Sequence, residues 1–165
     1  MVEFGYSYKP ATGTKSAKAQ GHDIEASYKD LTQVCAAIRG KMAGEAVKLL
    51  EDAAAMKIPI LYHKFNKRLG HRHELGGRKG RYPRKCARLV LEVLRNALGN
   101  AGFRGMGEAN LVVRHACANK QSIIGRLAPK GRRARMDYET ARVEIVLEEI
   151  PTKTETKTEK KNEKK

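Results

Sequence analysis

The chain has 165 residues and a mass of 18.4 kDa, which fits one domain of ordinary size and excludes a large multidomain enzyme. Its 34 lysines and arginines against 18 acidic residues give a formal charge of +16, which predicts a polyanionic partner. Hydrophobic residues make up 41% and aromatic residues 5%, so we expect a modest, aliphatic core.

Three cysteines, Cys35, Cys86 and Cys117, have the spacing of neither a disulfide framework nor a CxxC metal motif, which predicts a reducing, cytoplasmic location. No apolar run approaches the ~18 residues that a membrane span needs, and the N-terminus lacks a basic-then-apolar signal. We therefore expect no membrane partner, and nothing in the sequence indicates a homo-oligomer.

The first twenty residues are polar and are predicted to form an arm or an edge segment that buries little. Ser27 and Asp30 then have the spacing of a capping box. Apolar residues follow at helical spacing as far as Ile38, and Gly40 closes the segment. This pattern predicts a first amphipathic helix.

Two further helices are predicted downstream. The second begins near Ala43, has an apolar face and fades at Met56, before a proline. The third takes Pro83 as its first residue, presents a wide apolar stripe and ends at Gly102. The intervening residues 57–82 have no sustained periodicity and many glycines, so we expect a long, basic, functional loop.

Residues 111–113 and 142–149 have the composition of strands, and in the second the apolar residues alternate with polar ones. They are predicted to be the legs of one extended hairpin, 111–149, with a basic tip and a turn at residues 129–131. Residues 151–165 contain mainly Thr, Lys and Glu and are predicted to be a disordered tail that follows a single RNA-binding domain, 1–150.

The positive charge is concentrated in two segments. Residues 57–88 carry eleven cations against Glu74, and residues 114–142 carry eight against Asp137 and Glu139. These two segments account for the whole excess of +16. A surface that serves only solubility would mix basic and acidic residues, so this distribution favours the binding of a polyanion.

Arginine dominates the hairpin tip, and its planar guanidinium suits phosphate and stacks on bases, which favours nucleic acid over lipid. The cations lie on loops rather than on a groove-reading helix, which favours structured RNA over duplex DNA. The predicted RNA-binding residues are Lys64, Lys67, Arg68, Arg72, Arg78, Lys79, Arg81, Arg84, Lys85, Arg88, Lys120, Arg126, Lys130, Arg132, Arg133 and Arg135. Tyr62, Phe65 and Tyr82 either stack on unpaired bases or pin the loop to the domain.

Other patterns carry less weight. Residues 77–80 match the GXXG clamp of KH domains, but that pattern is short. His63, His71 and His73 lack a nearby cysteine, so no metal or cofactor is predicted, although incidental metal binding stays open. His115, Cys117 and Asp137 are catalytic residue types without a catalytic context. An RNA-processing enzyme and a chromatin-type DNA-binding protein are therefore the weaker alternatives.

An ordered set of short tracts resembles the universal large-subunit ribosomal protein family L-twenty-two in its archaeal form, called L-seventeen in eukaryotic naming. The tracts are Tyr6-Ser7, residues 18–21, residues 38–40, residues 80–87, Asn96-Ala97, Asn100-Ala101 and residues 143–148. The resemblance covers about residues 6 to 150, and the order and spacing of the tracts make it specific.

The resemblance implies an α+β fold, with three helices packed on a small three-stranded antiparallel sheet and a long protruding β-hairpin. It also implies a non-catalytic, ribosome-bound protein that binds large-subunit (23S-type) rRNA near the polypeptide exit tunnel, with residues 124–135 at the tunnel wall. The implied partners are rRNA, neighbouring large-subunit proteins and, near the hairpin tip, the nascent polypeptide. The basic segments found from charge alone are the family's RNA-facing segments.

Overall fold

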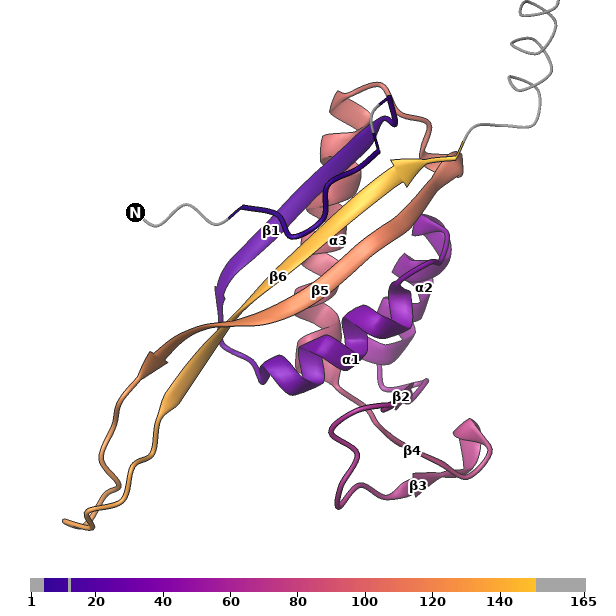
Figure 1. Cartoon of the computed structure of the whole chain (residues 1–165). Coiled ribbons are helices and arrows are strands. Elements are labelled where there is room, and N and C mark those ends of the chain that lie inside the picture. Colours follow the sequence, from indigo (N-terminus) through magenta and orange to yellow (C-terminus); the bar gives the residue numbers. More distant parts are fainter. Residues whose placement is uncertain (1–4, 12, 151–165) are drawn as a thin grey trace, which may run out of the picture.

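The computed structural model describes residues 5–11 and 13–150, and it has the predicted α+β architecture (Figure 1). The helices are α1 (Tyr28–Ile38), α2 (Ala43–Ala54) and α3 (Arg84–Phe103), with 3-10 turns η1 (His73–Leu75) and η2 (Glu108–Asn110). The strands are β1 (Ser16–Ile24), β2 (Ile60–Leu61), β3 (His71–Arg72), β4 (Arg78–Arg81), β5 (Leu111–Ile124) and β6 (Tyr138–Glu149).

The main sheet is antiparallel and has the strand order β1-β6-β5. The edge strand β1 pairs with β6 only as far as Ala141, whereas β5 continues to pair with β6 as far as Tyr138. The two long strands therefore leave the sheet as a protruding hairpin, as predicted (Figure 1). The observed strands are longer than the predicted ones. The buried hydrophobic residues among those added are Ala116, Ala118 and Ala141, and alanines give no strong strand pattern in the sequence.

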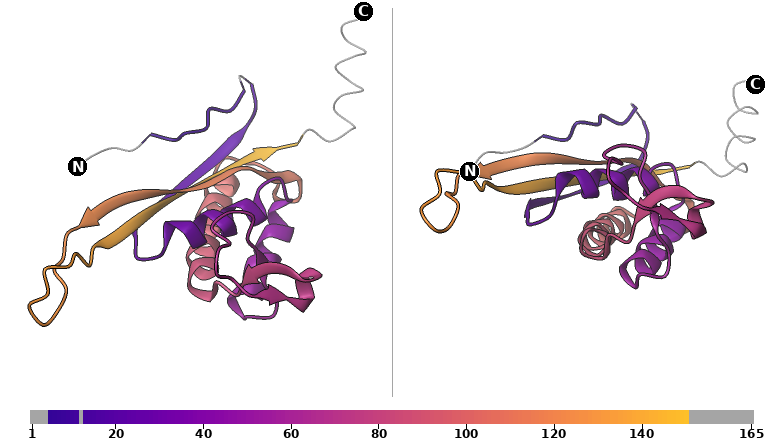
Figure 2. Two further views of the ribbon diagram at one scale, coloured as in Figure 1. Left: turned by 60° about the horizontal axis from the view of Figure 1, so that its bottom comes forward. Right: turned by 90° about the horizontal axis from the view of Figure 1, so that it is seen from below.

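The three helices cover one face of the main sheet (Figure 2, right). Helix α3 faces the core with fully buried residues at helical spacing, among them Val90, Leu94, Ala97 and Ala101. Strand β6 supplies Val143, Ile145 and Leu147, which alternate along the strand as predicted and are also fully buried. Among the described residues, no helix is long and apolar enough to cross a membrane.

The predicted helix ends are nearly correct, but two capping details were wrong. Ser27 stands at the N-cap of α1, yet its side chain makes no capping hydrogen bond, and Asp30 binds residues of another segment instead. Pro83 is the N-cap of α3 rather than its first residue, and the helix runs one residue past Gly102. Tertiary contacts of Asp30 have replaced the local capping box.

Residues 57–82 are not an irregular loop, and that prediction was wrong in part. Strands β2, β4 and β3 form a second antiparallel sheet, in which β4 lies between the other two. Two of these strands have only two residues each, which is too short for an alternating pattern to be visible in the sequence. The predicted basic loop is therefore a small folded platform below α1 and α2 in Figure 1.

The first twenty residues divide into two parts. From Ser16 onward they form β1, an edge strand that buries Ala17 and Ala19, so the expectation of little burial fails there. Residues 5–11, here called the N-terminal arm, cross the face of the main sheet that the helices leave free (Figures 1 and 2). The predicted tail, 151–165, lies outside the described residues.

Candidate nucleic-acid interface

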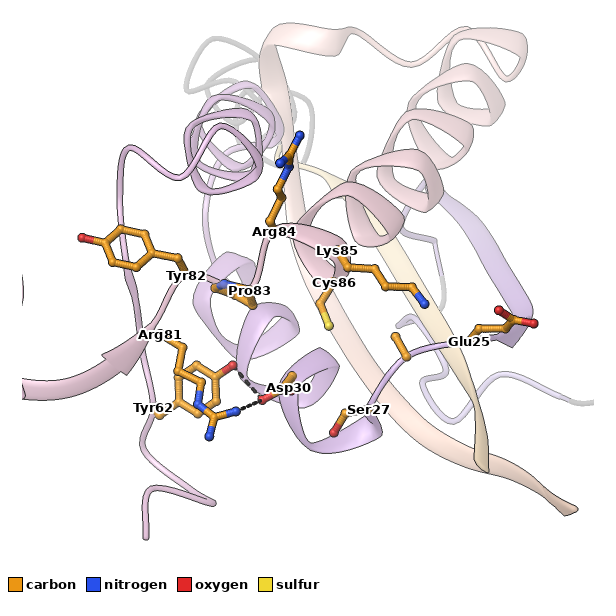
Figure 3. A pocket seen from close by; sticks show the side chains of 11 residues that line it. Glu25, Ser27, Asp30, Tyr62, Arg81, Tyr82, Pro83, Arg84, Lys85 and Cys86 are labelled. Carbon is orange, nitrogen blue, oxygen red and sulfur yellow. Dashed lines mark hydrogen bonds and ion pairs between the residues drawn. The ribbon is translucent and has the colours of Figure 1, made fainter. Parts of the chain in front are cut away.

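The platform is joined to α1 through the carboxylate of Asp30. The hydroxyl of the buried Tyr62 donates a hydrogen bond of 2.8 Å to Asp30 Oδ1, and Arg81 Nη1 lies 3.9 Å from the same oxygen (Figure 3). Burial and the bond to Asp30 raise the pKa of Tyr62 above its ordinary value. Tyr62 therefore attaches the platform to α1. Of the two roles that the sequence left open for Tyr62, this is attachment to the domain and not stacking on a base.

A buried glutamine of α1 provides a second attachment. Gln33 is 2% exposed, and its Oε1 accepts hydrogen bonds from the backbone amides of His63 at 3.0 Å and Lys64 at 3.2 Å. Both peptide groups belong to the turn after β2, whose side chains point to solvent. The predicted RNA-binding Lys64 is thus exposed on a backbone that the core holds in place.

Side-chain contacts also order the far end of the platform. The guanidinium of Arg72 lies 5.3 Å from the ring centroid of Tyr82, and the Tyr82 hydroxyl donates a hydrogen bond of 2.9 Å to Glu74. Arg78 Nε donates to the carbonyl of Leu75 at 3.0 Å. Tyr82 is half-buried and already engaged by Arg72, so it is less free to stack on a base than the sequence suggested.

Phe65 is the aromatic side chain of this segment that remains available. It is 44% exposed, and its ring makes an edge contact with Tyr28 at a centroid distance of 6.0 Å. The ammonium of Lys29 lies 5.7 Å from the Phe65 centroid. Lys29, Phe65, Asn66 and Lys67 line one open hollow, in which an exposed ring is flanked by two cations.

The hairpin projects beyond the main sheet and ends in a tight turn. Leu127 and Arg135 form an isolated bridge between its legs, and the amide of Ala128 bonds the carbonyl of Ala134 at 2.8 Å. Lys130 and Gly131 both have positive φ, 65° and 67°, which is the conformation of a tight hairpin turn. The predicted turn is therefore present. Figure 2 shows the tip lying away from the other described elements of the fold.

The sixteen predicted RNA-binding residues lie on these two projections and on the first turns of α3. All are exposed except Arg72 and Lys79, which are half-buried. Three of them form ion pairs, Arg81 with Asp30, Lys120 with Glu139 and Arg135 with Asp137. Within residues 5–11 and 13–150, the other predicted cations have no carboxylate partner. Their positive charge is therefore not neutralised by an ion pair within the part of the chain that the structure describes.

Sequence reasoning missed a set of exposed apolar side chains on the hairpin. Ile123 and Ile124 are each 53% exposed, Leu127 is 78% exposed and Met136 is 64% exposed. The sequence contained one signal for this surface: these apolar residues occur in a stretch that lacks the apolar alternation of a core-facing strand. Apolar side chains held away from a protein core are typical of a surface that is covered by a partner.

The comparisons with known proteins agree with this geometry. A family model described as ribosomal protein L22p/L17e matches residues 19–148, which include all sixteen predicted cations and most of the fold. The chain belongs to this family. As a member of the L22p/L17e family it is a structural constituent of the ribosome and not an enzyme, as predicted.

Archaeal relatives resemble this L22p/L17e protein over most of their length. The large ribosomal subunit protein uL22 of Archaeoglobus fulgidus is 42% identical over 151 residues, which is 90% of this chain and 97% of that protein. The uL22 protein of Methanocaldococcus jannaschii is 38% identical, over 82% of this chain and 88% of its own. The uL22 protein of Methanosphaera stadtmanae is 39% identical, over 87% of this chain and 96% of that protein.

Proposed function

We propose that the chain is a component of the large ribosomal subunit that binds large-subunit rRNA through the platform, the start of α3 and the hairpin. The observation that carries the proposal is the set of exposed cations on two separate projections, most of which form no ion pair with the carboxylates of the described residues. Phosphate groups that approach these cations release their counterions, which makes the binding favourable and dependent on salt.

The two projections have different proposed roles. The platform is attached to the core through Asp30 and Gln33, and α3 packs in the core through its own buried face. The cations of both are therefore held in fixed positions that suit one folded RNA surface. The hairpin tip has no such attachment within the described residues and reaches away from the core. We propose that it lines the wall of the polypeptide exit tunnel, between rRNA and the nascent chain.

The apolar residues of the hairpin fit this position. Arg126, Arg132 and Arg133 supply charge for phosphates, whereas Ile123, Leu127 and Met136 offer surface to bases, to a neighbouring ribosomal protein or to a passing polypeptide. The proposed location is accordingly cytoplasmic and ribosome-bound. Shape and charge, rather than the reading of bases, would guide binding.

Binding is tested with the purified full chain, large-subunit rRNA and duplex DNA at matched salt concentration. The double variant Arg84→Gln/Arg88→Gln removes two exposed cations from the first turns of α3, and Lys15→Gln/Lys48→Gln removes two exposed cations outside the basic segments. We expect the first variant, but not the second, to weaken rRNA binding. Equal loss in both variants, or a preference for duplex DNA, would contradict the proposal.

The tunnel position is tested separately in assembled particles. A photo-crosslinker at Lys130 is expected to react with a stalled nascent chain, whereas one at Lys48 on α2 is not. The particles are first washed in high salt, which removes peripheral factors but leaves an integral subunit protein in place. Crosslinks from Lys48 alone, or release of the protein by the wash, would contradict this assignment.

A further inference from the structure

His115, Cys117 and Glu144 bring three metal-binding atom types together on the sheet face that the N-terminal arm crosses. Glu144 Oε1 lies 3.3 Å from His115 Nε2 and 2.9 Å from Cys117 Sγ, and all three ligand atoms lie within 4.8 Å of one another. The cluster lies away from the basic platform and the hairpin tip. The proposed RNA-binding surface therefore makes no use of it.

A β-bulge places these side chains on one face. The pairing of β5 with β6 shifts between Val113 and His115, so that Arg114 is an extra residue. Before the bulge Val113 points into the core, and after it Ala116 does, which turns His115 and Cys117 outward. Cys117 lies directly opposite Glu144 in the register, so the three ligands come from two neighbouring strands.

The carboxylate in this cluster is unusual in its burial. Glu144 is 0% exposed and, among the described residues, pairs with no lysine or arginine. Instead, it accepts hydrogen bonds from the Ser7 amide and hydroxyl and from the Cys117 thiol, and it contacts His115. These contacts stabilise the carboxylate as an anion, and a bound cation would supply the countercharge that no lysine or arginine among the described residues provides.

The hydroxyl of Ser7 adds a fourth polar atom to the cluster. Ser7 Oγ lies 3.1 Å from His115 Nε2 and 3.8 Å from Cys117 Sγ, and it bonds Glu144 Oε1. The adjacent Tyr8 stacks on the His115 ring at 5.4 Å and donates to Glu148 at 2.8 Å. The arm therefore closes the cluster from the side opposite the core.

We propose that His115, Cys117 and Glu144 bind one Zn²⁺ ion, with the Ser7 hydroxyl or a water molecule as the fourth ligand. Zinc takes nitrogen, sulfur and oxygen ligands in tetrahedral geometry at about 2.0–2.3 Å, which requires ligand atoms roughly 3.3–3.7 Å apart. The two separations from Glu144, 2.9 and 3.3 Å, are close to that range, and all three ligand atoms lie within 4.8 Å of one another, so side-chain rotations would bring them to one ion. A thiolate and an imidazole together favour zinc over magnesium or calcium.

Charge balance supports this assignment. Binding requires that the Cys117 thiol lose its proton to solvent, and the resulting thiolate and the Glu144 carboxylate neutralise the two positive charges of the ion. The ion would also fix the N-terminal arm to the sheet through Ser7.

The proposal is tested on the purified, untagged full chain with Co²⁺ as a spectroscopic substitute for Zn²⁺. One equivalent of Co²⁺ is expected to produce a thiolate-to-cobalt charge-transfer band, and Zn²⁺ is expected to abolish it. The band should be absent from Cys117→Ser and kept in Cys86→Ala, which removes a cysteine buried beside the platform instead. No band in the wild type, or a band that survives in Cys117→Ser, would overturn the assignment.

A second variant tests the site at a residue whose substitution is not expected to unfold the protein. His115 is only half-buried, so His115→Gln is expected to fold, as circular dichroism can check. Loss of an outer-shell partner typically weakens metal affinity about 10–100-fold, so loss of this ligand should weaken Zn²⁺ binding by at least about 100-fold. His63→Gln, at an exposed histidine of the platform, should leave affinity unchanged. Equal affinities in the two histidine variants would overturn the site. Neither result depends on the RNA-binding proposal.

Discussion

The hydroxyl of Tyr62 and the carboxylate of Asp30 join two segments that lie 32 residues apart in the chain, through a hydrogen bond of 2.8 Å. Tyr62 is 3% exposed, so the bond replaces water for a group that would otherwise be buried without a partner. The same Asp30 oxygen faces Arg81 of β4. One carboxylate thus holds both ends of the platform against α1.

Removal of this hydroxyl should loosen the platform. The substitution Tyr62→Phe is expected to lower the free energy of unfolding by about 1–2 kcal/mol, because Asp30 loses its hydrogen-bond donor while the ring still packs. Urea denaturation measures the change. Tyr82→Phe is the matched control: its hydroxyl bonds the exposed Glu74, so stability should hardly change. A similar effect of both substitutions would contradict the assigned role of Tyr62.

Gly80 is required by the close approach of two strands of the platform. A Cβ atom at this position would lie 2.6 Å from the carbonyl oxygen of Ile60 and would also collide with the Leu75 side chain. We expect Gly80→Ala to disrupt the pairing of β2 with β4 and to cost roughly 1–3 kcal/mol. Hydrogen exchange of the β4 amides reports the local opening.

A second glycine variant provides the control for that measurement. Gly99 lies in α3, and a Cβ atom there would meet no atom within 4 Å. Gly99→Ala should therefore stabilise the helix by about 0.5–1 kcal/mol. Faster exchange in β4 of the Gly99→Ala protein would show that the platform responds to distant changes and would contradict the local explanation.

The hairpin tip should contribute to RNA affinity chiefly through charge. Replacement of Arg126, Lys130, Arg132 and Arg133 by glutamine removes four exposed cations. Each phosphate contact contributes about 0.7–0.9 to the slope of log affinity against log salt concentration, so the slope should fall by roughly 3. Filter binding to large-subunit rRNA over a range of salt concentrations measures it. An unchanged slope would mean that the tip contacts no phosphate.

The N-terminal arm should be released by the loss of one aromatic ring. Tyr8 stacks on His115 and donates a hydrogen bond to Glu148, so Tyr8→Ala removes both contacts. We expect limited proteolysis to cut the arm several-fold faster in this variant. Lys9→Ala, at an exposed neighbour, should leave the rate unchanged. If Lys9→Ala accelerates cleavage as much as Tyr8→Ala does, the arm is held by something other than the contacts of Tyr8.

Much of the fold could be predicted from the sequence because the helices carry long apolar patterns. Helix α3 has 20 residues and keeps one stripe throughout, so its position needed no tertiary information. The platform escaped prediction because β2 and β3 are too short to show a period. Its order depends on Asp30 and Gln33, which are distant in the sequence and have no local signature there.

Of the candidate nucleic-acid interface, only the positions of the charged residues could be predicted from the sequence. Acid-poor runs correctly indicated exposed cations, because a cation without a nearby acid is unfavourable to bury. The burial of Glu144 was not foreseen, since alternation along β6 placed it on the polar face. That face is covered by an arm whose docking depends on Ser7 and Tyr8, more than 130 residues away. Contacts of such separation leave no trace in a local pattern.

The extra residue at Arg114 lets Val113 and Ala116, which are three positions apart in β5, face the same core. On one side of it the strand contributes Val113 to the helix-covered core, and on the other it contributes His115 and Cys117 to the layer beneath the arm. If Arg114 were instead paired in the ladder like its neighbours, the two faces would be exchanged along half of β5, and His115 and Cys117 would be buried against the helices. Deletion of Arg114 would restore a regular ladder at this position with all other residues of β5 on their present faces, so the strand needs its bulge only because that one residue is there.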